Sequence, residues 1–295
     1  GLDQRIRLEE LPRNTTPSTA QLQEAEAMLT WGPPAGTLAQ MPKLRWAQAL
    51  TAGVEHWLAR TDLSPSLTLT CARGTHRVQM PENILGALFH ITKPYAAIVG
   101  DNAASTWTRR VSSTLAGQTL GILGLGAIGQ ELARKAAALE MRVIGTRRAT
   151  GPLPHVERVY APEETDEVLA QSDFVVLLLP ATPETENIIN ATRLARMKKT
   201  AWLLNFGRGA LIDDAALVAA AKSGTIAGAI LDVFRQEPLP KDDPFWGTEN
   251  ILVLPHIGGL HPARDSMVAA LLVENLRRFL DGASLKEVVD RKAGY

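Results

Sequence analysis

Residues 119–148 read TLGILGLGAIGQELARKAAALEMRVIGTRR and contain the pattern that decides the fold. An apolar run at Thr119–Leu123 is followed by three glycines spaced G-x-G-x-x-G, a helical pattern at Gly129–Leu139 and a second apolar run at Arg142–Gly145. A strand, a glycine loop, a helix and another strand in this order predict a βαβ unit that binds a dinucleotide.

Each glycine of the loop has its own physical role. Gly124 permits a tight turn, Gly126 lets the backbone approach a pyrophosphate, and Gly129 lets the helix pack close to the strand. The helix then offers the N–H groups of residues such as Ala127 and Ile128, and the positive end of its dipole, to the phosphates. S-adenosylmethionine is the alternative ligand for such a loop.

Short apolar runs continue to alternate with helical patterns up to Pro255. This alternation predicts an α/β fold with a parallel sheet covered on both faces. The further strand candidates are Phe174–Leu179, Ala201–Asn205, Ala227–Asp232 and Ile251–Leu254, and Asp214–Ser223 is a helix candidate. The N-terminal third repeats the pattern on a smaller scale, with strand candidates at Ala27–Trp31, Arg45–Leu50 and Leu67–Cys71.

Two long helical patterns, Pro81–Ile98 and Pro262–Asp281, flank the central block. We interpret them as crossings between two Rossmann-like or flavodoxin-like parallel-sheet domains with a cleft between them. The predicted substrate domain is discontinuous (residues 1–92 and 263–295), and the predicted dinucleotide-binding domain spans residues 93–262. A single large domain is the alternative.

Composition excludes several classes of protein. Lysine plus arginine and aspartate plus glutamate both number 31, so no net field recruits nucleic acid or a membrane surface. Apolar runs such as Met267–Val273 are far shorter than the roughly 20 residues that span a bilayer. The single cysteine, Cys71, excludes an internal disulfide and favours a reducing compartment. We expect a soluble cytoplasmic protein without a metal site, because no His, Cys and Asp cluster has ligand spacing.

The second strand of the βαβ unit ends at Thr146, Arg147 and Arg148. An NAD-specific site places an acid about 20 residues past the glycine loop, where it binds the ribose 2′-hydroxyl. Arginines at this place can instead pair with the 2′-phosphate of NADP. The pattern therefore predicts that NADP(H) is preferred and NAD(H) is possible, unless both arginines are solvated loop charges.

Three polar residues stand at the ends of later apolar strands: Arg208 in a Gly-Arg-Gly turn, Glu237 before a proline, and His256 after one. Taken singly, each is more often a surface or structural residue. Behind a nucleotide loop they fit the reduction of a ketone. Histidine can donate the proton, a neighbouring carboxylate favours its charged form, and arginine matches a substrate carboxylate.

Four stretches carry a resemblance to a known family: GILGLGAIGQELARKAAALEMRVIGTRR, LLLPATPETENIIN, LLNFGRGALIDDAALVAAAKSGTIAGAILDVFRQEPLP and NILVLPHIGG. Together they cover much of the chain, which resembles the D-2-hydroxyacid dehydrogenases. The phrases DVFRQEPLPKDDPFW and VVDRKAGY are similar to the glyoxylate/hydroxypyruvate reductase branch.

The resemblance implies roles for individual residues. His256 matches the family's acid/base, Glu237 its carboxylate partner, and Arg208 the arginine that holds the substrate's carboxylate and carbonyl. Gly53 and Val54 match a segment whose backbone N–H groups bind the substrate carboxylate.

Cofactor contacts and assembly are implied in the same way. Asp232 matches the acid that orients the nicotinamide carboxamide, and Pro180 and Thr182 lie in a stretch matching a cofactor loop. A homodimer joined through the cofactor domains is expected. The family usually begins with a strand-helix unit, whereas this sequence is expected to start near the following strand, at about Arg5–Leu8.

The leading interpretation is an NADPH-preferring reductase that converts glyoxylate or hydroxypyruvate into a D-2-hydroxy acid. A sibling interpretation is a formate or phosphoglycerate dehydrogenase. A corepressor or scaffold that senses NAD(H) and binds a partner protein on the same fold is an alternative of a different class.

Overall fold

The computed structural model describes residues 4–12 and 15–294. The chain forms two compact units: a smaller one comprising residues 1–75 and 262–295, and a larger one comprising residues 76–261. Each unit contains its own parallel sheet, of three and seven strands respectively. The predicted α/β class with parallel sheets is thereby confirmed.

The larger unit is built on a sheet whose strand pairings are all parallel, in the order β10-β9-β8-β7-β4-β5-β6. Its strands are β4 (Thr119–Leu123), β5 (Arg142–Thr146), β6 (Arg158–Tyr160), β7 (Phe174–Leu177), β8 (Trp202–Asn205), β9 (Gly228–Leu231) and β10 (Ile251–Val253). The chain runs from β4 outward to β6 and then returns past β4 to β7. Ligands of open parallel sheets bind at the carboxyl ends of the strands where the order reverses, here beside β4 and β7.

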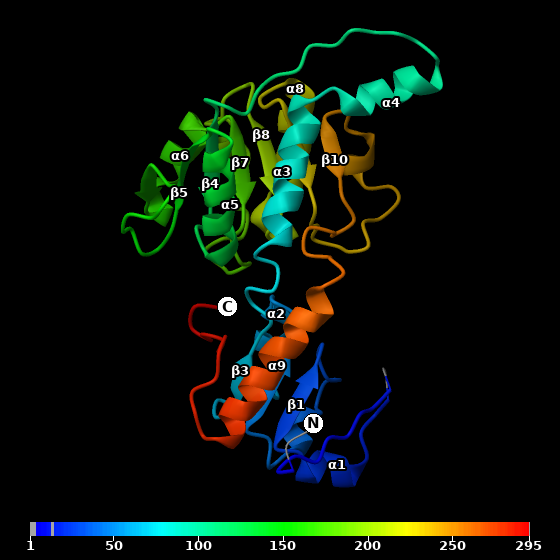
Figure 1. The fold of residues 1–295 in the computed structure, drawn as a ribbon, viewed down its shortest axis with the longest axis vertical. Coiled ribbons are helices and arrows are strands. Elements are labelled where there is room, and N and C mark those ends of the chain that lie inside the picture. The colour runs from blue at the N-terminus through cyan, green and yellow to red at the C-terminus, as the bar shows by residue number, and fades with distance from the viewer. Residues whose placement is uncertain (1–3, 13–14, 295) are drawn as a thin grey trace. The chain divides into compact units, whose positions relative to one another are not determined.

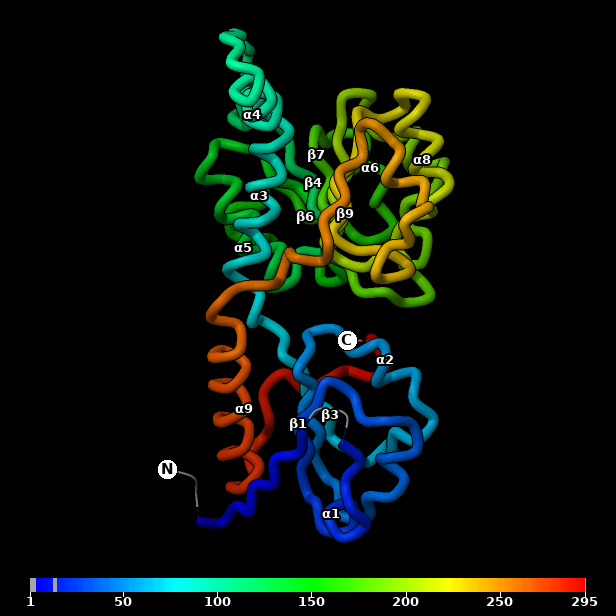
Figure 2. Tube along the Cα trace, turned by 90° about the vertical axis from the view of Figure 1, so that its right-hand side faces the viewer, coloured from blue at the N-terminus to red at the C-terminus, as the bar shows by residue number. Residues whose placement is uncertain are grey.

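Helices cover both faces of this sheet, with α3 and α5 on one side and α6 and α8 on the other (Figure 2). Successive strand residues alternate between the two cores: Val175 and Leu177 of β7 belong to one, and Val176 belongs to the other. Burial on both faces explains why the strands read as continuous apolar runs. The helices of the larger unit are α3 (Gln79–Thr92), α4 (Tyr95–Ala103), α5 (Ala127–Ala138), α6 (Thr165–Gln171), α7 (Ala191–Leu194) and α8 (Asp214–Ser223), with short 3₁₀ turns at Pro162–Glu164, Gly209–Leu211 and Pro244–Gly247.

The smaller unit holds β1 (Ala27–Thr30), β2 (Trp46–Ala49) and β3 (Thr68–Thr70), paired in that order and parallel. Its helices are α1 (Thr19–Glu24), α2 (Glu55–Leu58) and α9 (Arg264–Leu280), with a 3₁₀ turn at Leu38–Gln40. The amide of Asn275 on α9 donates to Gln48 Oε1 of β2 at 3.1 Å, and both side chains are buried. The C-terminal helix is therefore joined to the central strand of this sheet by a buried hydrogen bond.

The structure differs from the sequence-based expectations in four places. The helical pattern Pro81–Ile98 is two helices, α3 and α4, because Pro94 disfavours the helical conformation at Lys93, which is extended. Strand β6 was not expected, since three residues at a sheet edge leave little apolar pattern. Residues 5–8 form no strand. The unit boundary falls after Thr75, where residue 92 was expected.

The boundary follows from packing. Ile84 and Leu88 of α3 are fully buried in one core with Leu120 and Ile122 of β4, so this helix belongs to the larger unit. The second boundary falls at Pro262, within one residue of the expected one.

Helix α4 and the segment that follows it extend away from the sheet of the larger unit (Figure 1). The residues of α4 are exposed or half-buried, including Tyr95 and Val99. Beyond the helix, Trp107 is 91% exposed and Val111 is 97% exposed. Among the described residues, no helix has the length and apolarity that a membrane crossing requires.

Candidate active site

The glycine loop joins the end of β4 to the start of α5. Gly124 has φ +109°, a conformation that favours glycine, and a Cβ there would lie 2.9 Å from the Leu178 carbonyl carbon. A Cβ on Gly129 would lie 2.4 Å from the Gly124 carbonyl oxygen. These two glycines are therefore required by the turn and by the packing of helix on strand.

Gly126 differs from the other two glycines, because a Cβ there would meet no atom within 4 Å. The loop is thus open on the side of Gly126, and α5 begins at the next residue, Ala127. The first N–H groups of a helix have no intrahelical acceptor and carry the positive end of its dipole. An open backbone in front of such a helix fits the pyrophosphate of a dinucleotide.

The end of β5 brings the two arginines next to this loop. The Thr146 carbonyl accepts from the backbone N–H of Leu125 at 2.9 Å, and Arg147 N–H donates to the Tyr160 carbonyl at 3.0 Å. Thr146 is buried, whereas Arg148 is exposed. The backbone therefore presents Arg147 and Arg148 at the carboxyl end of β5, one strand away from the glycine loop.

The loop after β7 is closed by threonine side chains. Thr185 Oγ1 donates to the Pro180 carbonyl at 2.7 Å and accepts from Thr182 N–H at 2.8 Å. The pKa of Glu184 is lowered, mainly by a hydrogen bond from the Thr182 side chain and to a smaller degree by the charge of Arg148. Pro180 and Thr182 thus lie in a folded loop, and the charge of Arg148, which follows β5, lowers the pKa of an acid in this loop.

His256 and Glu237 form a direct pair. Glu237 Oε2 lies 2.6 Å from His256 Nδ1, and Glu237 Oε1 accepts from Phe234 N–H at 2.8 Å. The His256 side chain is 54% exposed. His256 has φ +53°, a conformation that costs energy for a residue other than glycine and is often retained where a side chain has a functional position.

Asp232 fixes the segment that carries His256. It is 1% exposed and accepts from Ile257 N–H at 2.7 Å and from Gly258 N–H at 2.8 Å. Burial raises the pKa of Asp232, while the two backbone N–H groups act in the opposite direction. Both carboxylate oxygens hold the backbone, although each oxygen keeps a second lone pair for a ligand.

The Arg208 turn is held by Asn205, which the sequence reasoning did not single out. Asn205 Oδ1 accepts from Gly207 N–H at 3.1 Å, and its amide donates to the Arg208 carbonyl at 2.9 Å. Asn205 is 1% exposed and ends β8. A polar residue closing an otherwise apolar strand is the signal that would have identified it.

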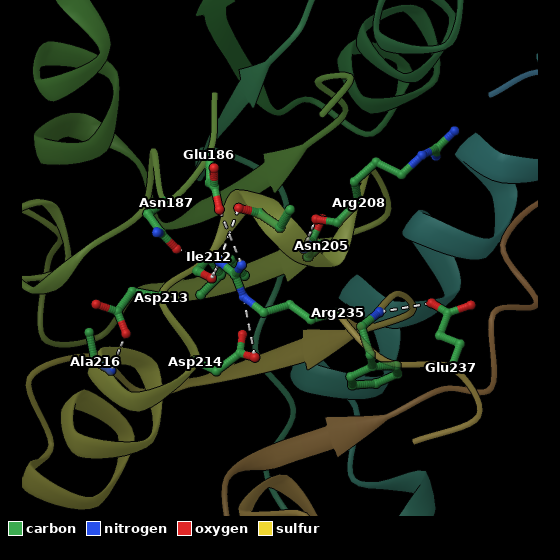
Figure 3. A network of polar contacts seen from close by, with 12 residues as sticks. Glu186, Asn187, Asn205, Arg208, Ile212, Asp213, Asp214, Ala216, Arg235 and Glu237 are labelled. Carbon is green, nitrogen blue, oxygen red and sulfur yellow. Dashed lines mark hydrogen bonds and ion pairs between the residues drawn. The ribbon is translucent and has the colours of Figure 1, made fainter. Parts of the chain in front are cut away.

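Gly209 brings the Arg208 turn against the Glu237 turn. A Cβ on Gly209 would lie 2.0 Å from the Phe234 carbonyl carbon and 2.4 Å from Arg235 N, so only glycine fits this contact. Figure 3 shows the Arg208 side chain extending away from the polar cluster around Arg235. The structure therefore places the Arg208 and Glu237 turns in backbone contact, and Glu237 in contact with His256.

Gly53 and Val54 lie in the smaller unit, just before α2. Thr51 Oγ1 donates to the Gly53 carbonyl at 2.6 Å, and Arg264 Nη2 donates to the Leu50 carbonyl at 2.6 Å. Val54 is 1% exposed. This segment follows β2 at its carboxyl end and is held by side chains on either side. Across the residues that the structure describes, no group of three or more His, Cys, Asp or Glu is arranged to hold a metal ion.

A fold with this glycine loop and this histidine–carboxylate pair is that of a nicotinamide-dependent dehydrogenase, and comparison with known proteins identifies the family. The family model for the NAD binding domain of D-isomer specific 2-hydroxyacid dehydrogenases matches residues 85–258. The chain belongs to the D-isomer specific 2-hydroxyacid dehydrogenase family. It is thus a member of a family of NAD(P)-binding oxidoreductases, and this match favours a nicotinamide dinucleotide over S-adenosylmethionine.

Two curated relatives show the range of named activities. The chain is 34% identical over 261 residues to a glyoxylate/hydroxypyruvate reductase B from Citrobacter koseri, covering 86% of this chain and 80% of that one. It is 33% identical over 259 residues to a glycerate dehydrogenase from Methylorubrum extorquens, covering 84% and 80%.

Solved structures are similar over most of the chain. A D-isomer specific 2-hydroxyacid dehydrogenase from Xanthobacter autotrophicus, in complex with NADPH and MES, has a TM-score of 0.84 at 35% identity and covers 92% of this chain and 86% of its own. An NADPH-dependent glyoxylate/hydroxypyruvate reductase from Sinorhizobium meliloti, in complex with NADP and sulfate, has a TM-score of 0.83 at 30% identity and covers 93% and 88%.

Proposed function

We propose that this protein is a reductase that prefers NADPH and converts glyoxylate into glycolate or hydroxypyruvate into the corresponding D-2-hydroxy acid. The observation that carries the proposal is the 2.6 Å contact between His256 Nδ1 and Glu237 Oε2, in the same unit as an open dinucleotide loop. The names of relatives such as the Citrobacter koseri enzyme support the substrate class.

The residues divide the chemistry among themselves. A reduced nicotinamide, when bound, supplies a hydride to the carbonyl carbon of the substrate. His256 donates a proton to the carbonyl oxygen, so that the carbonyl group becomes an alcohol. Glu237 occupies Nδ1, which leaves Nε2 as the nitrogen that faces the substrate.

The negative charge of the substrate is bound by a different residue, Arg208. Arg208 stays protonated, and its planar fork matches a 2-oxo acid, so it binds the carboxylate and stabilises the negative charge that develops on the carbonyl oxygen. Gly53 and Val54 bind the same carboxylate through backbone N–H groups. Asp232 orients the nicotinamide carboxamide while it holds the His256 segment in place.

The cofactor preference rests on the end of β5. Arg147 and Arg148 stand where an NAD-specific site has an acid, and they pair with the 2′-phosphate of NADPH. The Xanthobacter and Sinorhizobium structures are complexes with NADPH and NADP, which supports the same preference here. Pro180 and Thr182 contact the cofactor from the loop after β7.

The protein acts as a homodimer through α4 and the segment after it. Four large apolar side chains of this region, Tyr95, Val99, Trp107 and Val111, are 68% exposed or more. Several exposed large apolar side chains on one projecting element favour an interface. Light scattering at micromolar concentration should give twice the chain mass, and a double change of Trp107→Glu and Val111→Glu should lower it to that of the monomer.

Turnover tests the proposal directly. Oxidation of NADPH is followed by absorbance with glyoxylate, hydroxypyruvate, pyruvate and 3-phosphohydroxypyruvate, and the first two should give the highest kcat/KM. The variant His256→Asn serves as the control for contaminating reductases. If the purified protein binds NADPH but reduces none of these acids, the proposal is wrong and a dinucleotide-sensing role takes its place.

A further inference from the structure

Arg235 lies two residues before Glu237 and reaches across to two other strand-end loops (Figure 3). Its Nη2 donates to the Ile212 carbonyl at 2.6 Å and to the Ala210 carbonyl at 3.2 Å. The same nitrogen donates to Asn187 Oδ1. One guanidinium therefore joins the loop after β9, which carries Glu237, to the loops after β7 and β8.

Two carboxylates complete the surroundings of this guanidinium. Arg235 Nη1 lies 3.7 Å from Glu186 Oε1, and Arg235 Nε lies 3.5 Å from Asp214 Oδ2. Burial raises the pKa of Asp214, and the charge of Arg235 opposes that rise. Arg235 is thus held by acceptors on three segments, although its side chain is 35% exposed.

The two acceptor loops form one platform. Asn187 N–H donates to the Ala210 carbonyl at 2.9 Å, and Ile189 N–H donates to the Leu211 carbonyl at 3.0 Å. The turn that carries Glu237 lacks comparable support from burial, because Arg235, Gln236 and Glu237 are all exposed. Phe234, at the start of the turn, packs against the core, with its ring centroid 6.0 Å from that of Phe245. The exposed residues from Arg235 to Glu237 depend on polar contacts to stay against the platform.

We propose that Arg235 is a positioning residue that fixes the Phe234–Glu237 turn to this platform and so holds Glu237 in place for His256. The proposal rests on the proposed function, because it assigns Arg235 a part in the same proton transfer. An arginine suits this position because its planar group presents several donors at fixed angles, whereas lysine presents one ammonium that can reach fewer acceptors.

Further acids lie near the His256–Glu237 pair and near Arg235. Asp232 lies close enough that His256 and Glu237 both influence its pKa. Glu186 and Asp214 face Arg235 itself. A change at Arg235 can therefore alter the His256–Glu237 contact by moving Glu237. Loss of the positive charge without such a movement would change the pKa values of all nearby acids in the same direction.

A double-mutant cycle tests the proposal. Arg235→Gln and Arg235→Lys are made in the parent protein and in a Glu237→Gln background, and kcat, KM and the pH–rate profile are measured with glyoxylate and NADPH. We expect Arg235→Gln to lower kcat about 10-fold to 100-fold, the order of loss that follows misplacement of a reacting group. The pH–rate profile should change in the same direction as in Glu237→Gln, and Arg235→Lys should restore part of both effects.

In the Glu237→Gln background, Arg235→Gln should change kcat less than threefold, because a residue that acts through Glu237 has no further effect once that carboxylate is absent. Arg193→Gln is the matched control. Arg193 also binds a main-chain carbonyl of the loop after β7, that of Ile188 at 3.0 Å, and pairs with Asp166 at 2.9 Å, but it has no contact with the Glu237 turn. It should lower thermal stability while leaving kcat and the pH profile unchanged.

Two results would overturn the inference. The first is an Arg235→Gln protein that loses stability like Arg193→Gln but keeps the parent pH profile and kcat. The second is an equal loss of kcat in the presence and absence of Glu237. If Arg235→Gln does not fold, the Arg235→Lys pair in both backgrounds decides the question in the same way. Absence of turnover in the parent protein would instead contradict the proposed function.

Discussion

The glycine loop and the His256–Glu237 pair are built in opposite ways. The loop consists of six consecutive residues whose shape is set by backbone conformation and by close contacts, such as the 2.4 Å that would separate a Gly129 Cβ from the Gly124 oxygen. The pair joins residues 19 positions apart at the ends of two strands, and the histidine is 54% exposed. The proposed cofactor binding thus rests on a local motif, whereas the proposed proton transfer depends on how several strand ends come together.

This comparison makes the two regions separable by mutation. Changes in the pair should lower kcat and leave the affinity for the cofactor unchanged. Changes in the loop should weaken cofactor binding and leave kcat nearly unchanged. The expected effects differ in size because a proton donor acts on the transition state, whereas cofactor contacts contribute nearly equally before and during the reaction.

The largest effect is expected for His256→Asn. Loss of the general acid should lower kcat by about 10²-fold to 10⁴-fold. The dissociation constant for NADPH, measured by fluorescence titration, should stay within a factor of three of the parent value. Retention of most of the turnover would remove His256 from the role of proton donor.

Arg208→Lys should have the next largest effect. Lysine keeps the charge but loses the two-pronged geometry, so kcat/KM should fall about 10²-fold to 10³-fold, the loss seen when one stabilising donor is removed from a developing oxyanion. The loss should be similar for all 2-oxo acids. A loss confined to one substrate in a panel assay would make Arg208 a specificity residue instead.

Gly129→Ala tests the loop side of the comparison. The added methyl group must displace the Gly124 carbonyl. This displacement should destabilise the protein by about 1–3 kcal/mol and weaken the binding of both NADPH and NADH. Gly126→Ala is the matched control, because a Cβ at this residue would meet no protein atom within 4 Å. This substitution should leave thermal stability nearly unchanged and weaken cofactor binding. Equal melting temperatures for the two variants would contradict this account of the loop.

The smallest effect is expected at the end of β5. Arg147→Asp combined with Arg148→Ala should raise KM for NADPH about 10-fold to 100-fold, in line with the loss of one or two charge-assisted hydrogen bonds, and should change NADH little. The value of kcat should change least, because the 2′-phosphate lies far from the reacting carbon. Equal kcat/KM for the two cofactors in the parent protein would falsify the cofactor preference.

The comparison also explains which features could be predicted from the sequence. Strand β4 and helix α8 occur at the expected residues, because apolar runs and helical patterns are local signals. Strand β6 escaped prediction because a three-residue edge strand has little pattern, and the break between α3 and α4 was missed although Pro94 marks it.

The candidate site divides along the same line. The sequence singled out Arg208, Glu237 and His256 from their places at strand ends and from the family resemblance. Asn205, Asn187 and Arg235 were not singled out. Asn205 binds residues two and three positions further on, and the sequence marks it only as a polar residue that closes an apolar strand. Arg235 binds the side chain of Asn187 and the carbonyl of Ile212, 48 and 23 positions away, and a linear pattern does not relate these residues to it. The structure makes these relations visible, and with them the way in which the turns are held.

By itself, the sequence determined the βαβ unit, the parallel α/β class and the residue types available for hydride and proton transfer, because strand, loop and helix signals are all carried by neighbouring residues. Only the tertiary structure decided that α3 belongs with the seven-stranded sheet, that Gly209 lies against the backbone of Phe234 and Arg235, and that Glu237 lies 2.6 Å from His256. These contacts join residues from different strand ends. Their geometry depends on the packing of the whole sheet and its helices, which no short stretch of sequence encodes.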